Sequence, residues 1–445
     1  MMTLLGASGG VAQGDFFVLS QPSNNTGWAD MASSNAIAID SENNVYWLIG
    51  GTDSGLVKVD LNGTAVFDTR LEVYDSNRNN IQGLVIDSSD RAHIRGTYPP
   101  NNEDNVFLEC INGTTGAADY RMLFTDQEYF SGQGAQRYEG SGSNQLAIDS
   151  NDKLYFAAGY NSGSSTKRVI TWQATAGASA YTWNRTSRIS SNSTSNPNVR
   201  CVGTNGSGDL ICYFYSSNGS VLLRQDPSVQ ENQSLQSKYD VGAVNASHID
   251  KNGNFYIFKY QSSENDVTVL KYNSSGVKQF ETKLTKNTSY ISRILTYPGA
   301  IAVDDDGNVY CNITVEKSNY WRPMAVKLNS SGALQWINGV NWSQNTDMRA
   351  NAIAVDKTGS YYLGTGQNPV TCSKLPVAGN LTGTFSLWQY NITYSTDAWV
   401  TASSTSAFSN LSNSSEGTVE YFAYRSSGGG ADRLAFDAPR KDTLT

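Results

Sequence analysis

The sequence predicts an all-β fold, a β-propeller built of four-stranded antiparallel blades. A phrase of about ten residues returns at intervals of about fifty residues, giving seven clear repeats, and no helical periodicity separates the copies. Each interval has room for four short strands, which is the amount of chain in one propeller blade. One large ring therefore accounts for a chain of 445 residues that would otherwise suggest several domains.

The first half of each repeat predicts a hairpin. In AIAIDSENNVY, an apolar strand ends at an Asp, a residue that tolerates positive φ follows three positions later, and the next strand carries a Tyr. Because Asp side chains bond the backbone amides just ahead of them, this order fits a tight turn with a bulge. The loosest copy, VRCVGTNGSGDLIC, is anchored on Gly203. The copies begin at Ala36, Leu84, Gln145, Val199, Ser247, Ala300 and Ala352.

The second half of each repeat predicts a second hairpin, as in VKLNSSGALQW from Val326. Small residues such as Ala300 and Ala302 in the first strand fit an innermost strand, because these strands converge on the propeller axis. In the second copy His93 stands where other copies have Tyr, which favours a structural role for this His.

The ends of the chain predict how the ring closes. Residues 1–35 are expected to form an N-terminal docking segment and ring-closing strand, residues 36–400 the propeller of seven repeats, and residues 401–445 a C-terminal extension or degenerate last blade. Candidate strands around Ala407, Thr418 and Arg433 would form an eighth blade closed by the N-terminal strand DFFVLS. A seven-bladed ring with a C-terminal extension is the alternative.

Composition excludes several classes of partner. A net charge of -8 makes the chain a poor partner for a phosphate backbone, so no nucleic acid is expected. No apolar window is long enough to span a bilayer, so membrane insertion is not expected. The first basic residue is Lys58, so the start lacks the charged region of a secretion signal, and we expect synthesis in the cytoplasm. Five Cys at no metal-ligand spacing predict free thiols.

Catalytic chemistry is hard to place in this sequence. No nucleophile elbow, zinc-binding helix or phosphate loop is present, so we expect a non-enzymatic protein with no catalytic residue, cofactor or metal. His248 replaces a small residue on a predicted innermost strand and is a candidate for lining the central channel. Asp304 and Asp306 are candidate calcium ligands, although the same turn in other copies lacks the extra carboxylates and so does not require a metal.

Aromatic residues in loops are the candidates for ligand contact. Loops on a rigid scaffold commonly carry binding residues, and aromatic rings stack on sugar faces. Packing between blades is the alternative role for each of them. The predicted binding residues are Tyr98, Tyr129, Phe130, Tyr320, Trp321 and Trp399.

The phrase AIAVDDDGNVY followed by VKLNSSGALQW resembles the seven-bladed β-propeller repeat family found in bacterial surface proteins and in structural proteins of marine tailed phages. The resemblance covers roughly residues 36–390, and the opening MMTLLGASGG looks like the start of a phage virion protein. Propellers of this family serve as protein-docking platforms or glycan-recognition heads, and no catalytic motif carries over to particular residues.

The resemblance predicts a tail or fibre-associated structural protein of a tailed phage, located in the virion. Its expected partners are other virion proteins and a host-surface glycan, with multiple copies per assembly. Two other functions remain open on the sequence: a glycan-active propeller enzyme, either hydrolase or lyase, and a bacterial surface lectin or adhesin. Carboxylates converging in the central funnel would favour the enzyme.

Overall fold

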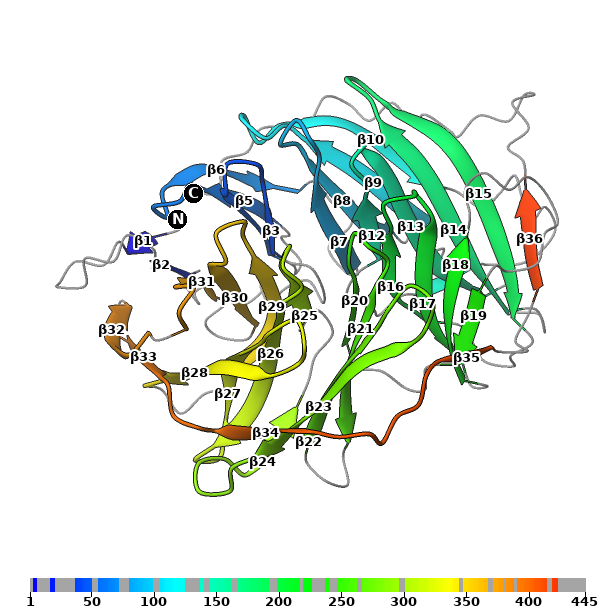
Figure 1. The fold of residues 1–445 in the computed structure, drawn as a ribbon. Coiled ribbons are helices and arrows are strands. Elements are labelled where there is room, and N and C mark those ends of the chain that lie inside the picture. Colours follow the sequence, from blue (N-terminus) through cyan, green and yellow to red (C-terminus); the bar gives the residue numbers. More distant parts are fainter. Residues whose placement is uncertain are drawn as a thin grey trace.

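The computed structural model shows a ring of antiparallel sheets, and its described residues contain no helix (Figure 1). The predicted all-β propeller of four-stranded blades is therefore confirmed. The described residues are 3–5, 17–20, 37–49, 55–71, 80–98, 105–124, 137–139, 145–161, 167–191, 198–216, 219–225, 237–240, 246–261, 266–295, 301–343, 347–366, 371–379, 381–387, 390–413 and 418–422.

Six blades are each built from four strands that follow one another in the chain, ordered from the ring axis outwards. Blade 1 contains β3 (Ile37–Ile39), β4 (Val45–Ile49), β5 (Gly55–Val59) and β6 (Ala65–Arg70). Blade 2 contains β7 (Asn80–Ile86), β8 (Ala92–Tyr98), β9 (Asn105–Ile111) and β10 (Ala118–Phe124). Blade 3 contains β12 (Leu146–Ile148), β13 (Lys153–Asn161), β14 (Lys167–Ala176) and β15 (Tyr181–Ser191), with β11 (Arg137–Glu139) as a second innermost segment.

The next three blades repeat this order. Blade 4 contains β16 (Asn198–Thr204), β17 (Leu210–Ser216), β18 (Gly219–Gln225) and β19 (Ser237–Asp240). Blade 5 contains β20 (Ala246–Ile249), β21 (Phe255–Gln261), β22 (Asp266–Tyr272) and β23 (Lys278–Lys286). Blade 6 contains β25 (Ile301–Val303), β26 (Val309–Lys317), β27 (Tyr320–Leu328) and β28 (Leu334–Trp342), with β24 (Arg293–Leu295) as a second innermost segment.

A composite sheet, called blade 7 here, closes the ring. Its chain contributes β29 (Arg349–Val355), β30 (Tyr361–Gly366) and β31 (Thr371–Leu375), and the fourth strand is β2 (Phe17–Ser20) from the N-terminus. β2 pairs antiparallel with β31, and β1 (Thr3–Leu5) adds outside β2. The N-terminal strand therefore closes the ring as expected, but its partner is the seventh repeat and not a strand beyond residue 401.

The predicted eighth blade is wrong for the described residues. The chain after blade 7 forms β32 (Gly383–Leu387) and β33 (Tyr390–Ser395), and then β34 (Val400–Ser404), β35 (Ser412–Asn413) and β36 (Thr418–Phe422). β33, β34, β35 and β36, which we call the C-terminal strap, pair in turn with the outer strands of blades 6, 5, 4 and 3 (Figure 1). Each strand finds an existing sheet edge, so no separate blade forms. The candidate strand at Arg433 lies outside the described residues.

The strap is fixed between β34 and β35 by one buried carboxylate. Glu281 accepts hydrogen bonds from the amides of Ala407 (2.9 Å) and Phe408 (3.0 Å) and from the ammonium of Lys278 (2.7 Å). Burial alone would raise the pKa of Glu281, but these bonds and one from Thr405 outweigh it and lower the pKa. The charged form of Glu281 therefore ties the strap to blade 5.

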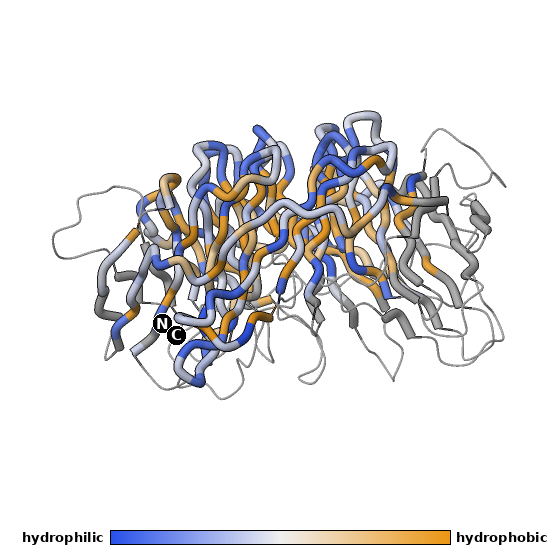
Figure 2. The backbone as a smooth tube through the Cα atoms, turned by 60° about the horizontal axis from the view of Figure 1, so that its bottom comes forward, coloured by the Kyte–Doolittle hydropathy of each residue, from blue (hydrophilic) through white to orange (hydrophobic). Residues whose placement is uncertain are grey.

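The hydrophobic core is divided among the boundaries between sheets. The described residues form seven buried clusters, each of which combines side chains of two neighbouring sheets, and one of them lies between blade 7 and blade 1. Hydrophobic residues concentrate in the strands, and hydrophilic turns gather along one face (Figure 2). Both faces of every sheet are thus buried, which explains why the strands read as apolar runs.

The cysteines belong to these cores. All five are free, as the sequence predicts, and the structure shows that all five are buried. Cys201 contributes to the cluster between blades 4 and 5, whereas Cys212 contributes to the one between blades 3 and 4. The two thiols therefore lie on opposite faces of one sheet.

Among the described residues, no helix has the length and apolarity needed to cross a membrane.

Candidate functional site

One face of the ring carries the first hairpin turn of every repeat, and we call it the turn face. In each turn an Asp or Asn side chain accepts hydrogen bonds from the backbone amides two and four residues later. The residue three positions later has positive φ, as the repeat predicts. The turns begin at Asp40, Asp87, Asp149, Asn205, Asp250, Asp304 and Asp356.

The fourth turn corrects the sequence register. Asn205, and not Gly203, accepts the amides of Ser207 and Asp209, and Gly208 has the positive φ of +77°. Gly203 instead lies in the innermost strand, where a Cβ atom would come within 2.4 Å of the Ile249 side chain. The repeat predicts an Asp at the start of this turn, but here Asn205 accepts the backbone amides in its place, so the anchor of the copy lies two residues after Gly203.

In four blades the repeated Tyr forms a hydrogen bond with the turn of its own blade. Tyr155, Tyr256, Tyr310 and Tyr362 donate their hydroxyls to the turn Asp of their own blade at 2.9 to 3.2 Å. In the second copy the ring Nε2 of His93 lies 3.0 Å from Asp87 Oδ2, so the His takes the place of the Tyr. His93 is fully buried, and its Nδ1 lies 2.9 Å from the hydroxyl of Tyr181 in blade 3.

A Lys on the third strand adds to this cluster in four blades, and sequence reasoning missed it. Lys58, Lys271, Lys327 and Lys374 each stand opposite the repeated Tyr across the sheet. The first three ammonium groups lie 4.9 to 5.2 Å from the Tyr ring centroid. All four Lys residues stand two positions before the second turn of their repeat, and this fixed spacing could have identified them from the sequence.

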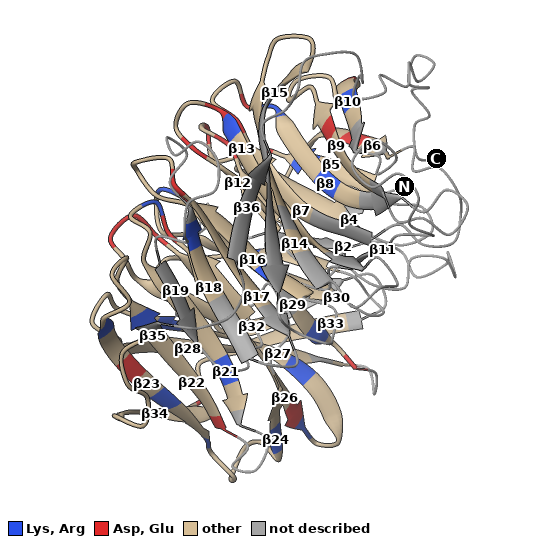
Figure 3. Cartoon of the chain, turned by 90° about the vertical axis from the view of Figure 1, so that its right-hand side faces the viewer, with Lys and Arg blue, Asp and Glu red and all other residues tan. Residues whose placement is uncertain are grey.

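The turns are also linked across blade boundaries. Ser41 donates its amide and hydroxyl to Asp90 at 2.9 and 3.0 Å, and Ser88 does the same to Asp152 at 2.8 and 2.5 Å. Lys251 reaches Asp305 of blade 6 at 2.5 Å. Asp90, Asp152 and Asp305 therefore connect neighbouring blades. Many acidic residues of the molecule lie in these turns (Figure 3).

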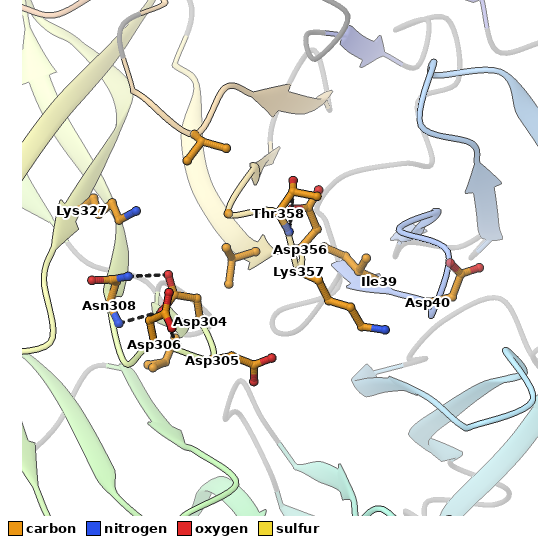
Figure 4. A pocket seen from close by; sticks show the side chains of 14 residues that line it. Ile39, Asp40, Asp304, Asp305, Asp306, Asn308, Lys327, Asp356, Lys357 and Thr358 are labelled. Atoms are coloured by element: carbon orange, nitrogen blue, oxygen red, sulfur yellow. Dashed lines mark hydrogen bonds between the residues drawn. The ribbon is translucent and has the colours of Figure 1, made fainter.

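A pocket of about 400 Å³ opens on the turn face where blades 6, 7 and 1 meet (Figure 4). Asp305 extends into it from blade 6 and Lys357 from blade 7, with Asp40 of blade 1 beyond (Figure 4). Four aliphatic side chains supply the apolar part of the wall. The lining comprises Ile39, Asp40, Val303, Asp304, Asp305, Asp306, Asn308, Lys327, Val355, Asp356, Lys357, Thr358, Gly359 and Val377.

The three turn carboxylates in the pocket are already engaged. Oδ1 of Asp304 accepts two backbone amides, and its Oδ2 accepts Asn308 Nδ2 (2.8 Å) and the Tyr310 hydroxyl (3.2 Å). Asp40 and Asp356 are held in the same manner. Asp306, the other calcium candidate, is exposed in the turn. Among the described residues no group of three or more His, Cys, Asp or Glu is arranged to hold a metal ion.

The predicted aromatic residues are not gathered at this pocket. Tyr320 and Trp321 follow a turn formed by Ser318 and Asn319, both with positive φ, at the end of the blade away from the turn face. Trp321 is half-buried, and its carbonyl accepts the Met348 amide at 2.9 Å. Tyr98 ends β8 at that same end, and nothing is described of its side chain. Tyr129 and Phe130 lie outside the described residues.

Trp399 is a correction to the sequence prediction. It is fully buried between blades 5 and 6, where Gly339 leaves room for its ring, because a Cβ at that position would lie 2.6 Å from it. The ammonium of Lys317 lies 4.4 Å from the indole centroid. Trp399 is therefore an anchor of the C-terminal strap and not an exposed ligand contact.

His248 lies on innermost strand β20, opposite Tyr256, and keeps part of its surface exposed. Burial lowers the pKa of His248 to about 4, and the nearby Asp250 charge opposes this shift only in part. The imidazole is therefore neutral at physiological pH. Lining of the central channel by His248 stays a prediction.

No protein-family model matches the chain, and no curated protein does. Among solved structures, the polysaccharide lyase Uly1 aligns at 11% identity and a TM-score of 0.41, over 77% of this chain and 90% of the lyase. The WD40 domain of SCAP from fission yeast aligns at 9% identity and 0.36, over 82% and 99%. A protein of unknown function from Bacteroides caccae aligns at 11% and 0.34, over 75% and 92%. At these values none of them bears on the chemistry of this chain.

Proposed function

We propose that this protein is a non-enzymatic binding propeller, a tail or fibre-associated structural protein of a tailed-phage virion, which recognises a host-surface glycan through its turn face. The pocket between blades 6, 7 and 1 carries the proposal. Its volume of about 400 Å³ lies in the range of ligand pockets. Carboxylates accept hydrogen bonds from sugar hydroxyls, and Lys357 donates to their oxygens.

Binding is favoured over cleavage by the state of the pocket carboxylates. Glycoside cleavage needs one carboxyl group to deliver a proton and a second to act as base or nucleophile. Both oxygens of Asp40, Asp304 and Asp356 accept hydrogen bonds from within their own blades. Asp305 and Asp306 are exposed, and the ion pair of Asp305 with Lys251 is exposed too, so both carboxylates are accessible to a ligand.

The virion assignment is supported by the resemblance of the repeats to propellers of marine tailed phages. The partners are then other virion proteins, with several copies in each assembly. The C-terminal strap covers the outer edges of blades 3 to 6. Covered edges cannot pair with strands of other chains, which suits a rigid component of a particle.

The glycan proposal is tested with the double substitution Asp305→Asn and Asp306→Asn. Binding to host-surface polysaccharide, measured by calorimetry, should weaken at least tenfold, since two charged acceptors at the pocket are lost. Asp119→Asn, at an exposed site on β10, is the matched control and should bind as the wild type does. Unchanged binding by the double variant would refute the assignment of the pocket. Shortening of the polysaccharide would instead select the glycan-active enzyme.

The virion proposal is tested by mass spectrometry and antibody labelling of purified particles. Labelled tails or fibres are the expected result. Absence of the chain from the particles, or its presence on intact uninfected cells, would contradict the proposal, and the second result would select the bacterial adhesin.

A further inference from the structure

Arg95 is a charged side chain that the proposed function does not use. It lies on β8, the second strand of blade 2, and has no exposed surface. One hydrogen bond is made, from Nη2 to the carbonyl of Ala157 in blade 3, at 3.3 Å. Nε and Nη1 have no hydrogen-bond partner. The guanidinium has five N–H donors, and the three on Nε and Nη1 have no acceptor.

No ion pair of Arg95 with an acidic side chain is found in the part of the chain that the structure describes. Glu109 lies on the neighbouring strand β9, but it stands opposite Ile94, whereas Arg95 stands opposite Leu108. Successive residues of a strand point to opposite faces, so Glu109 lies on the face toward blade 1 and Arg95 on the face toward blade 3. Glu109 is also paired with Arg121. Burial alone lowers the pKa of Arg95, to about 9, so the group is still protonated at neutral pH.

Arg95 lies next to a stretch of β13 in blade 3 whose inner edge is paired with neither β11 nor β12. The innermost edge of β13 is paired with β12 through Phe156 and with β11 from Gly159 onward. Ala157, which accepts the Arg95 hydrogen bond, belongs to the stretch between the two pairings. The other buried polar residue in this slot of the repeat, Asn312 of blade 6, is neutral and donates to the carbonyl of Ala352 at 2.9 Å. A neutral side chain can thus make the hydrogen bond to the next blade at this position of the repeat, so the bond does not require a charged residue.

We propose that Arg95 is the core of an anion site between blades 2 and 3, which takes a small oxoanion such as sulfate, phosphate or the carboxylate of an acidic sugar. An unpaired buried ion is strongly destabilising in a protein interior, and an oxoanion supplies both the missing charge and several acceptor oxygens. Arg is the side chain best matched to such groups.

The test compares thermal unfolding of the full-length wild type and R95M in millimolar sodium sulfate at constant ionic strength. Sulfate at high concentration stabilises proteins in general, so the readout is the difference between the two proteins. The wild-type Tm should rise by about 2 °C in a saturable manner, and that of R95M should not. Without sulfate, R95M should have the higher Tm, because the unpaired charge is gone.

Parallel responses of the two proteins, or an equal rise with chloride, would overturn the proposal. R121M is the matched control: its Arg is paired with Glu109, so its response to sulfate should be kept. If R95M does not fold, calorimetric titration of the wild type with sulfate decides, and the absence of saturable heat refutes the site. A larger rise with glucuronate than with sulfate would identify an acidic sugar as the ligand.

Discussion

Asp90 and Asp152 show how a single residue can serve two blades. Each occupies a left-handed turn position, with φ of 59° and 57°, that most repeats fill with Gly. An Asp there costs backbone energy that Gly does not. The same carboxylates accept two hydrogen bonds each from Ser41 and Ser88 of the preceding blades, which offsets the cost.

We expect Asp152→Gly to destabilise the wild type by about 1 kcal/mol, because two hydrogen bonds from Ser88 are lost. In a Ser88→Ala background the same substitution should cost less, because the hydroxyl bond is already absent and only the bond from the backbone amide of residue 88 is lost. Urea denaturation of the four proteins measures the coupling. Equal effects in both backgrounds would contradict the account.

His248 predicts an acid-sensitive stability. Its pKa is about 4 in the folded protein and 6.5 as an ordinary His, so the unfolded chain binds the proton more tightly. The contribution of neutral His248 is complete above pH 6.5 and falls by about 1.4 kcal/mol per pH unit as pH drops toward 4. His248→Asn should remove this slope from urea denaturation between those pH values. A slope shared by both proteins would assign the effect elsewhere.

At the residue scale the sequence predicted the turns better than the ligand contacts. The Asp, the positive-φ position and the Tyr recur at fixed spacing, so His93 could be assigned to its structural slot. The role of Trp399 could not be foreseen, since its burial depends on Gly339, a residue sixty positions earlier that leaves room for the ring. Arg95 carries no periodic signal, and only its burial without a partner reveals it.

At the element scale, the buried Trp399 side chain anchors the strap where β34 pairs with β23 of blade 5. Trp399→Ala should lower the free energy of unfolding by about 3–5 kcal/mol, because a large cavity opens beside Gly339. Hydrogen exchange should also accelerate in β23 and β34, which pair directly after this anchor. Trp321→Ala, at a half-buried position, is the control and should cost less. Similar losses for both variants would show that Trp399 is no special anchor.

Strand positions near the C-terminus were predictable, but their partners were not. The segments around Ala407 and Thr418 contain or adjoin β34, β35 and β36. Their pattern does not say which edge they join, since a two-residue strand such as β35 can add to any open edge. Glu281, on a distant strand, fixes the choice by holding the amides of Ala407 and Phe408.

At the scale of the whole molecule, ring closure depends on β2. Leu19→Pro removes a backbone donor from a strand paired on both sides and should cost about 3 kcal/mol, which opens blade 7 about 100-fold more often. Buried Cys372, opposite Leu19, should then react with a maleimide about 100-fold faster, while Cys311 should not. Leu4→Pro in edge strand β1 is the control. Unchanged labelling of Cys372 would mean that the ring stays closed without β2.

The pairing of β2 with β31 also has a consequence for synthesis of the chain. About 350 residues separate the two strands, so β2 leaves the ribosome long before its partner exists. At 5–20 residues per second the delay is roughly 20–70 s. During that time blades 1 to 6 can form in order, but of blade 7 only β2 exists, and it has no partner until β29, β30 and β31 are made. The ring is therefore completed only after β31 has been synthesised, and a nascent chain shortened before residue 371 should remain open.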